Sequence, residues 1–107
     1  PLGAKVLNDY LQTLKSKKHI ILGMMANKDH EEYMSYFKNI SSLTTIDIPN
    51  QPNSIKGKDL KNKLDKFPNL NYEKSIEDAL KKISTDNDDI ILITGSLYLA
   101  GEVLNLN

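Results

Sequence analysis

The segment that most constrains the fold of this chain is IILITGSLYLAGEVL, residues 90 to 104. A short apolar, β-prone stretch ends at Thr94-Gly95-Ser96, and helical spacing of apolar residues begins at once. In an open α/β sheet, small molecules bind at such turns, where a strand gives way to a helix whose first N–H groups lack partners. Gly95 allows close approach of the backbone, and Ser96 suits either a helix cap or a ligand contact. The turn alone leaves both roles of Ser96 open.

The same alternation of strand and helix signals runs along the whole chain. Asp29, followed three residues later by Glu32, is typical of a capped helix start. Gly23 ends one apolar run, and Pro49 ends another. The predicted helices cover 2–14, 29–40, 60–67 and 75–83, with a last one from 97; the predicted strands cover 18–22, 43–48, 69–73 (a short edge strand) and 89–94.

This order predicts a single α/β domain over residues 1–107, with a mostly parallel sheet and helices on both faces. Right-handed crossovers place the carboxyl ends of parallel strands on one edge. Three turns are therefore expected to share that edge: Gly23 to Lys28, Pro49 to Gly57, and Thr94 to Ser96.

Composition excludes several classes of function. The chain has 14 basic and 14 acidic residues, so nothing favours binding to nucleic acid. The cluster of Lys15, Lys17 and Lys18 is interpreted as solvated linker charge. There is no cysteine, no apolar stretch near the roughly 18 residues of a membrane span, and no signal peptide at the start. We expect a soluble, cytoplasmic domain with neither nucleic acid nor membrane as a partner.

The chain contains no self-contained nucleotide or nucleophile motif. The turns at Gly23 and Gly95 match neither a dinucleotide fingerprint nor a phosphate-binding loop, and Ser96 does not lie in a G-x-S-x-G elbow. The two histidines have no metal-ligand spacing, so no metal site is expected. His19 is predicted at the surface or at a sheet edge, whereas His30, in the first turn of a helix near the ligand edge, is a possible ligand contact.

Lys28 is the strongest candidate for binding an anion. It follows a strand-to-helix loop beside the Asp29 cap, where a lysine can hold a carboxylate or phosphate. Together with Ser96 and a helix amino terminus, it would converge on one anion at the sheet edge. The alternative is an ordinary exposed lysine.

Two segments carry a family resemblance. ILGMMANKD at 21–29 and ITGSLYLAGEVL at 93–104 closely resemble the carboxyl-terminal domain of folylpolyglutamate synthase and dihydrofolate synthase, of the Mur ligase superfamily. PLGAK at 1–5 resembles the direct continuation of the family motif Asp-Gly-Ala-His-Asn. The resemblance implies a Rossmann-like three-layer domain that is a fragment of a larger enzyme and lacks its first strand.

The resemblance also implies a function. Such ligases use ATP to convert a folate or dihydropteroate carboxylate to an acyl phosphate, which the amine of L-glutamate attacks. Lys28 and Ser96 would bind the glutamate carboxylate, Tyr98 would pack beside it, and the loop would be shaped by Gly23, Asn27, Asp29 and Gly95. ATP and Mg²⁺ would be bound in the intact enzyme through the missing amino-terminal ATPase domain. The fragment alone would bind neither and would be inactive.

The sequence differs from the family pattern in one loop, and two other interpretations of the chain stay open. The loop 48–54 lacks the Arg that some relatives carry, which puts phosphate contacts from this loop in doubt. If the absent strand is central, its neighbours have unpaired backbone groups, and the fragment is destabilised or completed by another chain. The alternatives are a free-standing α/β module that binds small anions without catalysis and, more weakly, a receiver-like interaction domain. The choice between folate and dihydropteroate as acceptor is not encoded here.

Overall fold

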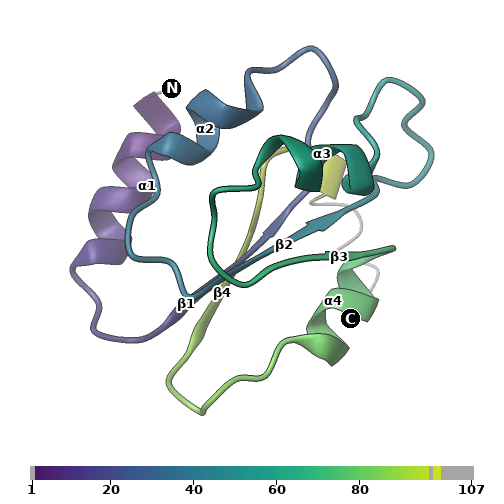
Figure 1. The fold of residues 1–107 in the computed structure, drawn as a ribbon. Coiled ribbons are helices and arrows are strands. Elements are labelled where there is room, and N and C mark those ends of the chain that lie inside the picture. The colour runs from purple at the N-terminus through teal and green to yellow at the C-terminus, as the bar shows by residue number, and fades with distance from the viewer. Residues whose placement is uncertain (1, 97, 100–107) are drawn as a thin grey trace.

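The computed structural model describes residues 2–96 and 98–99 as an α/β domain (Figure 1). All four strands of its sheet are parallel, in the order β3-β2-β1-β4. The elements, in chain order, are α1 (Leu2–Gln12), β1 (Lys18–Leu22), α2 (His30–Ser35), β2 (Ser42–Ile46), α3 (Gly57–Lys63), β3 (Leu70–Glu73), α4 (Ile76–Lys82) and β4 (Ile90–Thr94).

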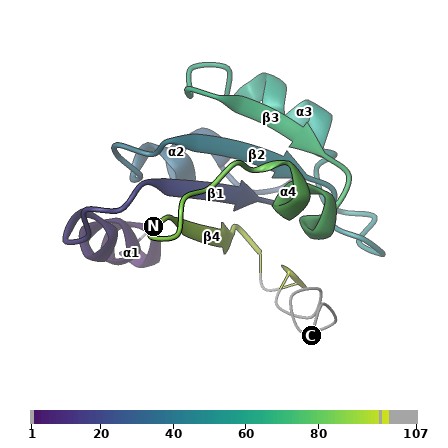
Figure 2. The same cartoon turned by 90° about the horizontal axis from the view of Figure 1, so that it is seen from below.

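The direction of each crossover decides which face its helix covers. From β1 to β3 the chain steps toward one edge, so right-handed crossovers place α2 and α3 on the same face. From β3 the chain returns across β2 and β1 to reach β4, and α4 therefore covers the opposite face (Figure 2). The predicted parallel sheet with helices on both faces is confirmed.

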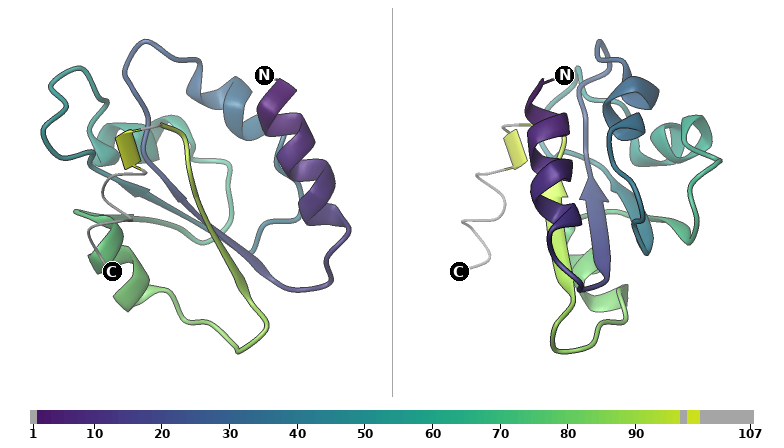
Figure 3. Two further views of the ribbon diagram at one scale, coloured as in Figure 1. Left: turned by 180° about the vertical axis from the view of Figure 1, so that it is seen from behind. Right: turned by 90° about the vertical axis from the view of Figure 1, so that its left-hand side faces the viewer.

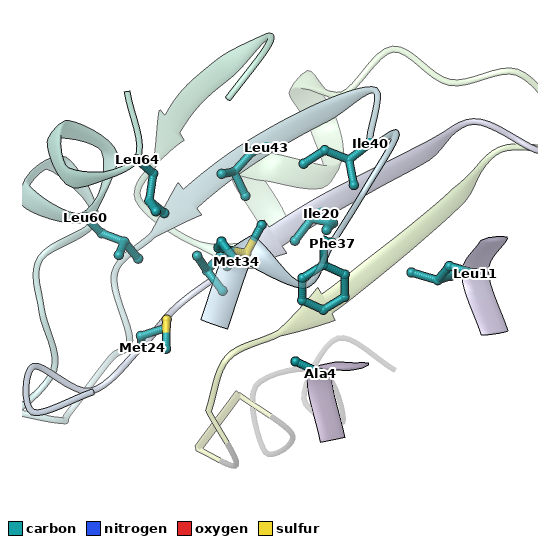
Figure 4. Packing of buried hydrophobic residues seen from close by; sticks show 11 residues of the cluster. Ala4, Leu11, Ile20, Met24, Met34, Phe37, Ile40, Leu43, Leu60 and Leu64 are labelled. Atoms are coloured by element: carbon teal, nitrogen blue, oxygen red, sulfur yellow. The ribbon is translucent and has the colours of Figure 1, made fainter. Parts of the chain in front are cut away.

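Each face of the sheet carries its own apolar core. On one side, α1, α2 and α3 pack against Ile20, Leu22 and Leu43 (Figure 4). On the other side, α4 packs against Ile21 and Ile46. Alternating residues of β1 therefore serve opposite cores, as the two-residue period of a strand requires.

Local signals fix the starts of α2 and α4, but several helices end earlier than predicted. The side chains of Asp29 and Ser75 accept hydrogen bonds from the N–H groups of Glu32 and Asp78, which confirms the predicted cap at Asp29 and the predicted helix start at Ser75. However, α2 ends at Ser35 rather than near Ile40, and α3 covers Gly57–Lys63 rather than 60–67. Asn39 has a left-handed backbone (φ 55°), which turns the chain toward β2 while Ile40 still reaches the core.

In the described sheet no gap lies beside β1, and the absence of a further strand stays a prediction. β1 pairs with β2 over four residues and with β4 over five, so its backbone is hydrogen-bonded on both sides (Figure 3). The edges of the described sheet are β3 and β4. All five residues of β4 remain half-buried, although four of them are Ile or Leu.

Two polar residues at the start of β1 are buried, contrary to expectation. Lys18 is not solvated linker charge, because its ammonium donates to the carbonyl of Leu14 at 2.6 Å. His19 is only 6% exposed rather than at the surface, because its ring bonds to Ser42 and Asp89. In both cases a specific partner satisfies the polar group, which makes its burial tolerable.

The predicted final helix falls largely outside the described residues, which include only Tyr98 and Leu99 of that segment. Over the part of the chain that the structure describes, none of the helices combines the length and apolarity needed to cross a membrane.

Candidate functional site at the topological switch point

The carboxyl ends of β1 and β4 meet where the winding of the sheet reverses. From β1 the chain proceeds to β2 on one side, and it reaches β4 on the other side of β1 only after the return crossover. The switch point therefore lies between β1 and β4. The N–H of Gly23 donates to the carbonyl of Thr94 at 3.2 Å, which joins the two turns directly. In open α/β sheets this is the place where ligands bind.

Gly95 is required at this junction. Its φ is +114°, a conformation that residues with a side chain rarely adopt. A Cβ at this position would also collide with the carbonyl oxygen of Gly23 and lie 2.8 Å from Cδ1 of Leu22. The close approach of the two turns therefore depends on a missing side chain, as the sequence predicts for Gly95.

A cavity of about 320 Å³ lies between the two turns. Its lining combines one cation, two carboxylates, one phenol and an apolar wall: Met24, Lys28, Asp29, Glu32, Tyr33 and Gly95. The structure therefore brings Lys28 and Asp29 from one turn together with Gly95 from the other. Charges of both signs in one small cavity suit a zwitterionic ligand.

The loop that carries Lys28 is held by its neighbours in sequence. The N–H of Lys28 donates to the carbonyl of Met25 at 3.4 Å. The Nε2–H of His30 donates to the same carbonyl at 2.9 Å, and the ring is only 3% exposed. Asp29 caps α2 at 3.0 Å. His30 thus shapes the loop, while the Lys28 side chain remains exposed, with no ion pair or hydrogen bond among the described residues.

A second loop braces the first from the side. The N–H of Ala26 donates to the carbonyl of Asn53 at 2.8 Å, and the N–H of Ile55 donates to that of Met24 at 3.0 Å. Met25 and Ser54 form an isolated antiparallel bridge between these bonds. The loop from Pro49 to Gly57 therefore lies at the same sheet edge, as predicted.

The bracing loop is itself fixed by Asp47, which follows β2. Its Oδ1 accepts the N–H of Gly57 at 2.7 Å, and its Oδ2 accepts the Tyr72 hydroxyl at 2.5 Å. That hydrogen bond, with burial and the nearby charge of Asp47, raises the pKa of Tyr72 to about 12. The Tyr72 ring leaves no room for a side chain at Gly57, since a Cβ there would lie 2.5 Å from Cε1.

Ser96 and Tyr98 lie just beyond the second turn. The Oγ of Ser96 accepts the N–H of Tyr98 at 3.2 Å, which is the helix-cap role that the sequence left open. Among the residues that the structure describes, the Ser96 hydroxyl donates to no acceptor. Tyr98 is 54% exposed, and Asn27 is exposed in the Lys28 loop.

Tyr33 and Thr94 extend the site beyond the predicted residues. The Tyr33 hydroxyl lies 2.5 Å from Oγ1 of Thr94, so it ties α2 to the end of β4 beside the cavity. The helical spacing of Tyr33 assigns it only to the buried face of its helix. The link to Thr94 spans 61 positions, and no local pattern signals it.

The described residues offer little for a metal ion. Within residues 2–96 and 98–99, no three side chains of His, Cys, Asp or Glu gather closely enough to hold one.

These features define a doubly wound α/β domain with a cavity at its switch point. The chain belongs to the Mur ligase family, because the profile described as "Mur ligase, glutamate ligase domain" matches residues 1–97. Curated protein sequences give no match.

Solved structures with the same fold include folylpolyglutamate synthases. A bifunctional folylpolyglutamate synthase/dihydrofolate synthase from Yersinia pestis is 17% identical over 99% of this chain, with a TM-score of 0.84. Folylpolyglutamate synthase from Thermotoga maritima is 20% identical over 99% of this chain, with a TM-score of 0.83. The chain spans 26% and 25% of those two enzymes. A further bifunctional enzyme, 16% identical with a TM-score of 0.78 over 99% of this chain and 26% of its own, was solved with Mn, AMPPNP and L-glutamate bound.

Proposed function

We propose that this chain is the carboxyl-terminal domain of an ATP-dependent ligase that adds L-glutamate to folate or dihydropteroate, and that it is inactive alone. The observation that carries the proposal is the cavity at the switch point, where Lys28, Asp29 and Glu32 face one small space. L-Glutamate presents two carboxylates and one ammonium group. The ammonium of Lys28 is complementary to one of these carboxylates, and the acidic side of the cavity is complementary to the ammonium group, which a simple anion lacks.

The proposed roles follow from the positions of the side chains. Lys28, which is exposed and without a partner among the described residues, pairs with a carboxylate of glutamate. Ser96 donates its hydroxyl proton to the same carboxylate, and Tyr98 packs beside it. The His30 contact and the Asp29 cap hold the Lys28 backbone in place before the ligand arrives. Such preorganisation lowers the entropic cost of binding.

The proposed chemistry needs more than this domain supplies. The acceptor carboxylate receives the γ-phosphoryl group of ATP, the glutamate amine attacks the acyl phosphate, and inorganic phosphate leaves. ATP, Mg²⁺ and the acceptor are assigned to another domain of the same enzyme. This is in keeping with the share of the folate ligases that the chain spans. This domain contributes the nucleophilic substrate, held in position for attack.

Steady-state kinetics of the full-length protein test these roles. Lys28→Ala and Ser96→Ala are expected to raise the KM for glutamate about tenfold or more and to leave the KM for ATP nearly unchanged, since each removes a hydrogen bond to a charged group. Lys15→Ala is the matched control, because Lys15 is an exposed lysine outside the sheet edge that carries the site. Unchanged glutamate kinetics in both variants would refute the assigned roles. Anion binding without ATP-dependent ligation would instead favour the anion-binding module.

A further inference from the structure

A second polar cavity lies at the opposite, amino-terminal edge of the sheet. It has a volume of about 720 Å³. It is lined by the starts of three strands and by the connection from α4 to β4, which passes along this edge (Figure 1). The ligand site described above lies at the carboxyl ends of the strands, so the two cavities are separate.

Three side chains in this cavity form a continuous hydrogen-bonded chain. Nε2 of His19 lies 2.9 Å from Oδ2 of Asp89, and Nδ1 of His19 lies 2.7 Å from Oγ of Ser42. The side chains of His19 and Asp89 are 8% and 7% exposed. The imidazole and carboxylate are thus shielded from bulk water, while Ser42 is half-buried at the cavity wall.

The chemistry of the partners fixes the direction of the bond to Asp89, and the protonation of the ring sets the direction of the bond to Ser42. A carboxylate only accepts, so His19 donates Nε2–H to Asp89. In the neutral form of the ring, which is the form that can act as a base, Ser42 donates its hydroxyl proton to Nδ1. Asp89 also accepts the N–H of Asp86 at 3.2 Å, and the hydrogen bond from His19 holds the pKa of Asp89 below its usual range. A hydroxyl aimed at an imidazole that a carboxylate orients is the arrangement that activates serine as a nucleophile.

We propose that Ser42 is an acylatable nucleophile, with His19 as its base and Asp89 as the positioning residue, and that this cavity hydrolyses small carboxylic esters. The two ring nitrogens exchange the roles they have in serine hydrolases, which the chemistry allows because either nitrogen of a neutral imidazole can act as the base. Lys17 and Lys82 line the same cavity and supply positive charge for an oxyanion.

The proposed reaction has two balanced steps. The Oγ of Ser42 attacks the ester carbonyl carbon while its proton passes to Nδ1 of His19. The tetrahedral oxyanion collapses, the bond to the leaving oxygen breaks, and that oxygen takes the proton from His19 and departs as an alcohol. Water, deprotonated by His19, then attacks the acyl-serine, releases the carboxylic acid and restores the Ser42 hydroxyl.

The reaction of the full-length protein with p-nitrophenyl acetate tests this proposal. We expect a burst of one p-nitrophenolate per protein and one acetyl group on Ser42, located by fragmentation of the tryptic peptide 39–56. Ser42→Ala should slow the burst about a hundredfold or more, as should His19→Asn, which removes the base. Ser41→Ala is the matched control, since Ser41 lines the same cavity but has no bond to His19.

A purely structural network gives a different result. It would lower the melting temperature of Ser42→Ala, yet the parent protein would show no burst or would carry the acetyl group on Lys17 or Lys82. Either finding overturns the proposal. If Ser42→Ala fails to fold, Ser42→Cys takes its place, because it keeps a nucleophile of similar size. The folded Cys variant should gain the acetyl group as a thioester, and a folded variant that stays unlabelled also overturns the proposal.

Discussion

At the scale of single residues, Gly95 carries two constraints at one backbone position. Its φ of +114° favours glycine, and its Cα faces the carbonyl of Gly23 too closely for any side chain. The first constraint concerns conformation and the second concerns packing, so relief of one would leave the other. Because the same contact brings Lys28 and Gly95 around one cavity, stability and site geometry meet at this residue.

We therefore expect Gly95→Ala to lower the free energy of unfolding by about 1 to 3 kcal/mol, the usual cost of a strained backbone position. Urea denaturation followed by circular dichroism measures it. Gly3→Ala is the matched control, since Gly3 lies in α1 and a Cβ there meets nothing within 4 Å. That variant should be neutral or stabilised by up to about 1 kcal/mol. Equal losses in the two variants would contradict the expected role of Gly95.

Predictability at the residue scale depends on how far apart the partners lie in sequence. The caps at Asp29 and Ser75 bond to groups three residues away, so local spacing suffices to identify them. The partners of His19 lie 23 and 70 positions away, and its burial follows only from the assembled sheet. Local sequence patterns therefore cannot predict the role of a residue that depends on the register between strands.

At the scale of elements, the spacing of apolar residues, which alternates between the period of a strand and that of a helix, predicts the strands and helices well. It does not predict where they end. Ile46 ends β2, two residues before the predicted boundary at Ile48, because the side chain of Asp47 turns to bind Gly57 and Tyr72. The same loop then pairs with the Lys28 loop through Met25 and Ser54. A pattern of Pro and Asn predicts a loop there, but contacts between loops decide its conformation.

The Asp47–Tyr72 contact predicts a pH dependence of stability. The raised pKa means that the folded protein holds the Tyr72 proton more tightly than the unfolded chain, whose tyrosine titrates near 10. This stabilisation is complete below pH about 10 and disappears as pH rises toward about 12. We expect the urea concentration at the midpoint of unfolding to fall over that pH range. In Tyr72→Phe the midpoint should fall less steeply. Tyr10→Phe, which removes the hydroxyl of an exposed tyrosine, serves as control.

If the two variants follow the same curve between pH 10 and 12, Tyr72 is not the group responsible. Absorbance of the phenolate gives an independent reading, because the tyrosine that titrates last in the folded protein should be missing from Tyr72→Phe alone.

At the scale of the whole molecule, the doubly wound topology separates the two ends of the strands from the two apolar cores on the faces of the sheet. The helices stabilise the faces, whereas both cavities lie where strands begin or end. Changes at Lys28 or Ser42 should therefore alter chemistry with little effect on the cores. Changes in the cores should alter stability first. The distinction matters for the kinetic tests above, since a loss of activity can then be separated from a loss of fold.

Two leucines in helices on opposite faces test the contribution of the cores. Leu60 in α3 is completely buried, and Leu80 in α4 is 38% exposed. Leu60→Ala removes three carbons from a packed site and is expected to cost about 2 to 5 kcal/mol of unfolding free energy, whereas Leu80→Ala should cost less than about 1 kcal/mol. The urea concentrations at the midpoints of unfolding measure both losses, provided that the dependence of the unfolding free energy on urea concentration is the same in each variant. A loss at Leu80 as large as that at Leu60 would mean that the face around α4 is covered in the intact protein by a further part of the chain or by a partner.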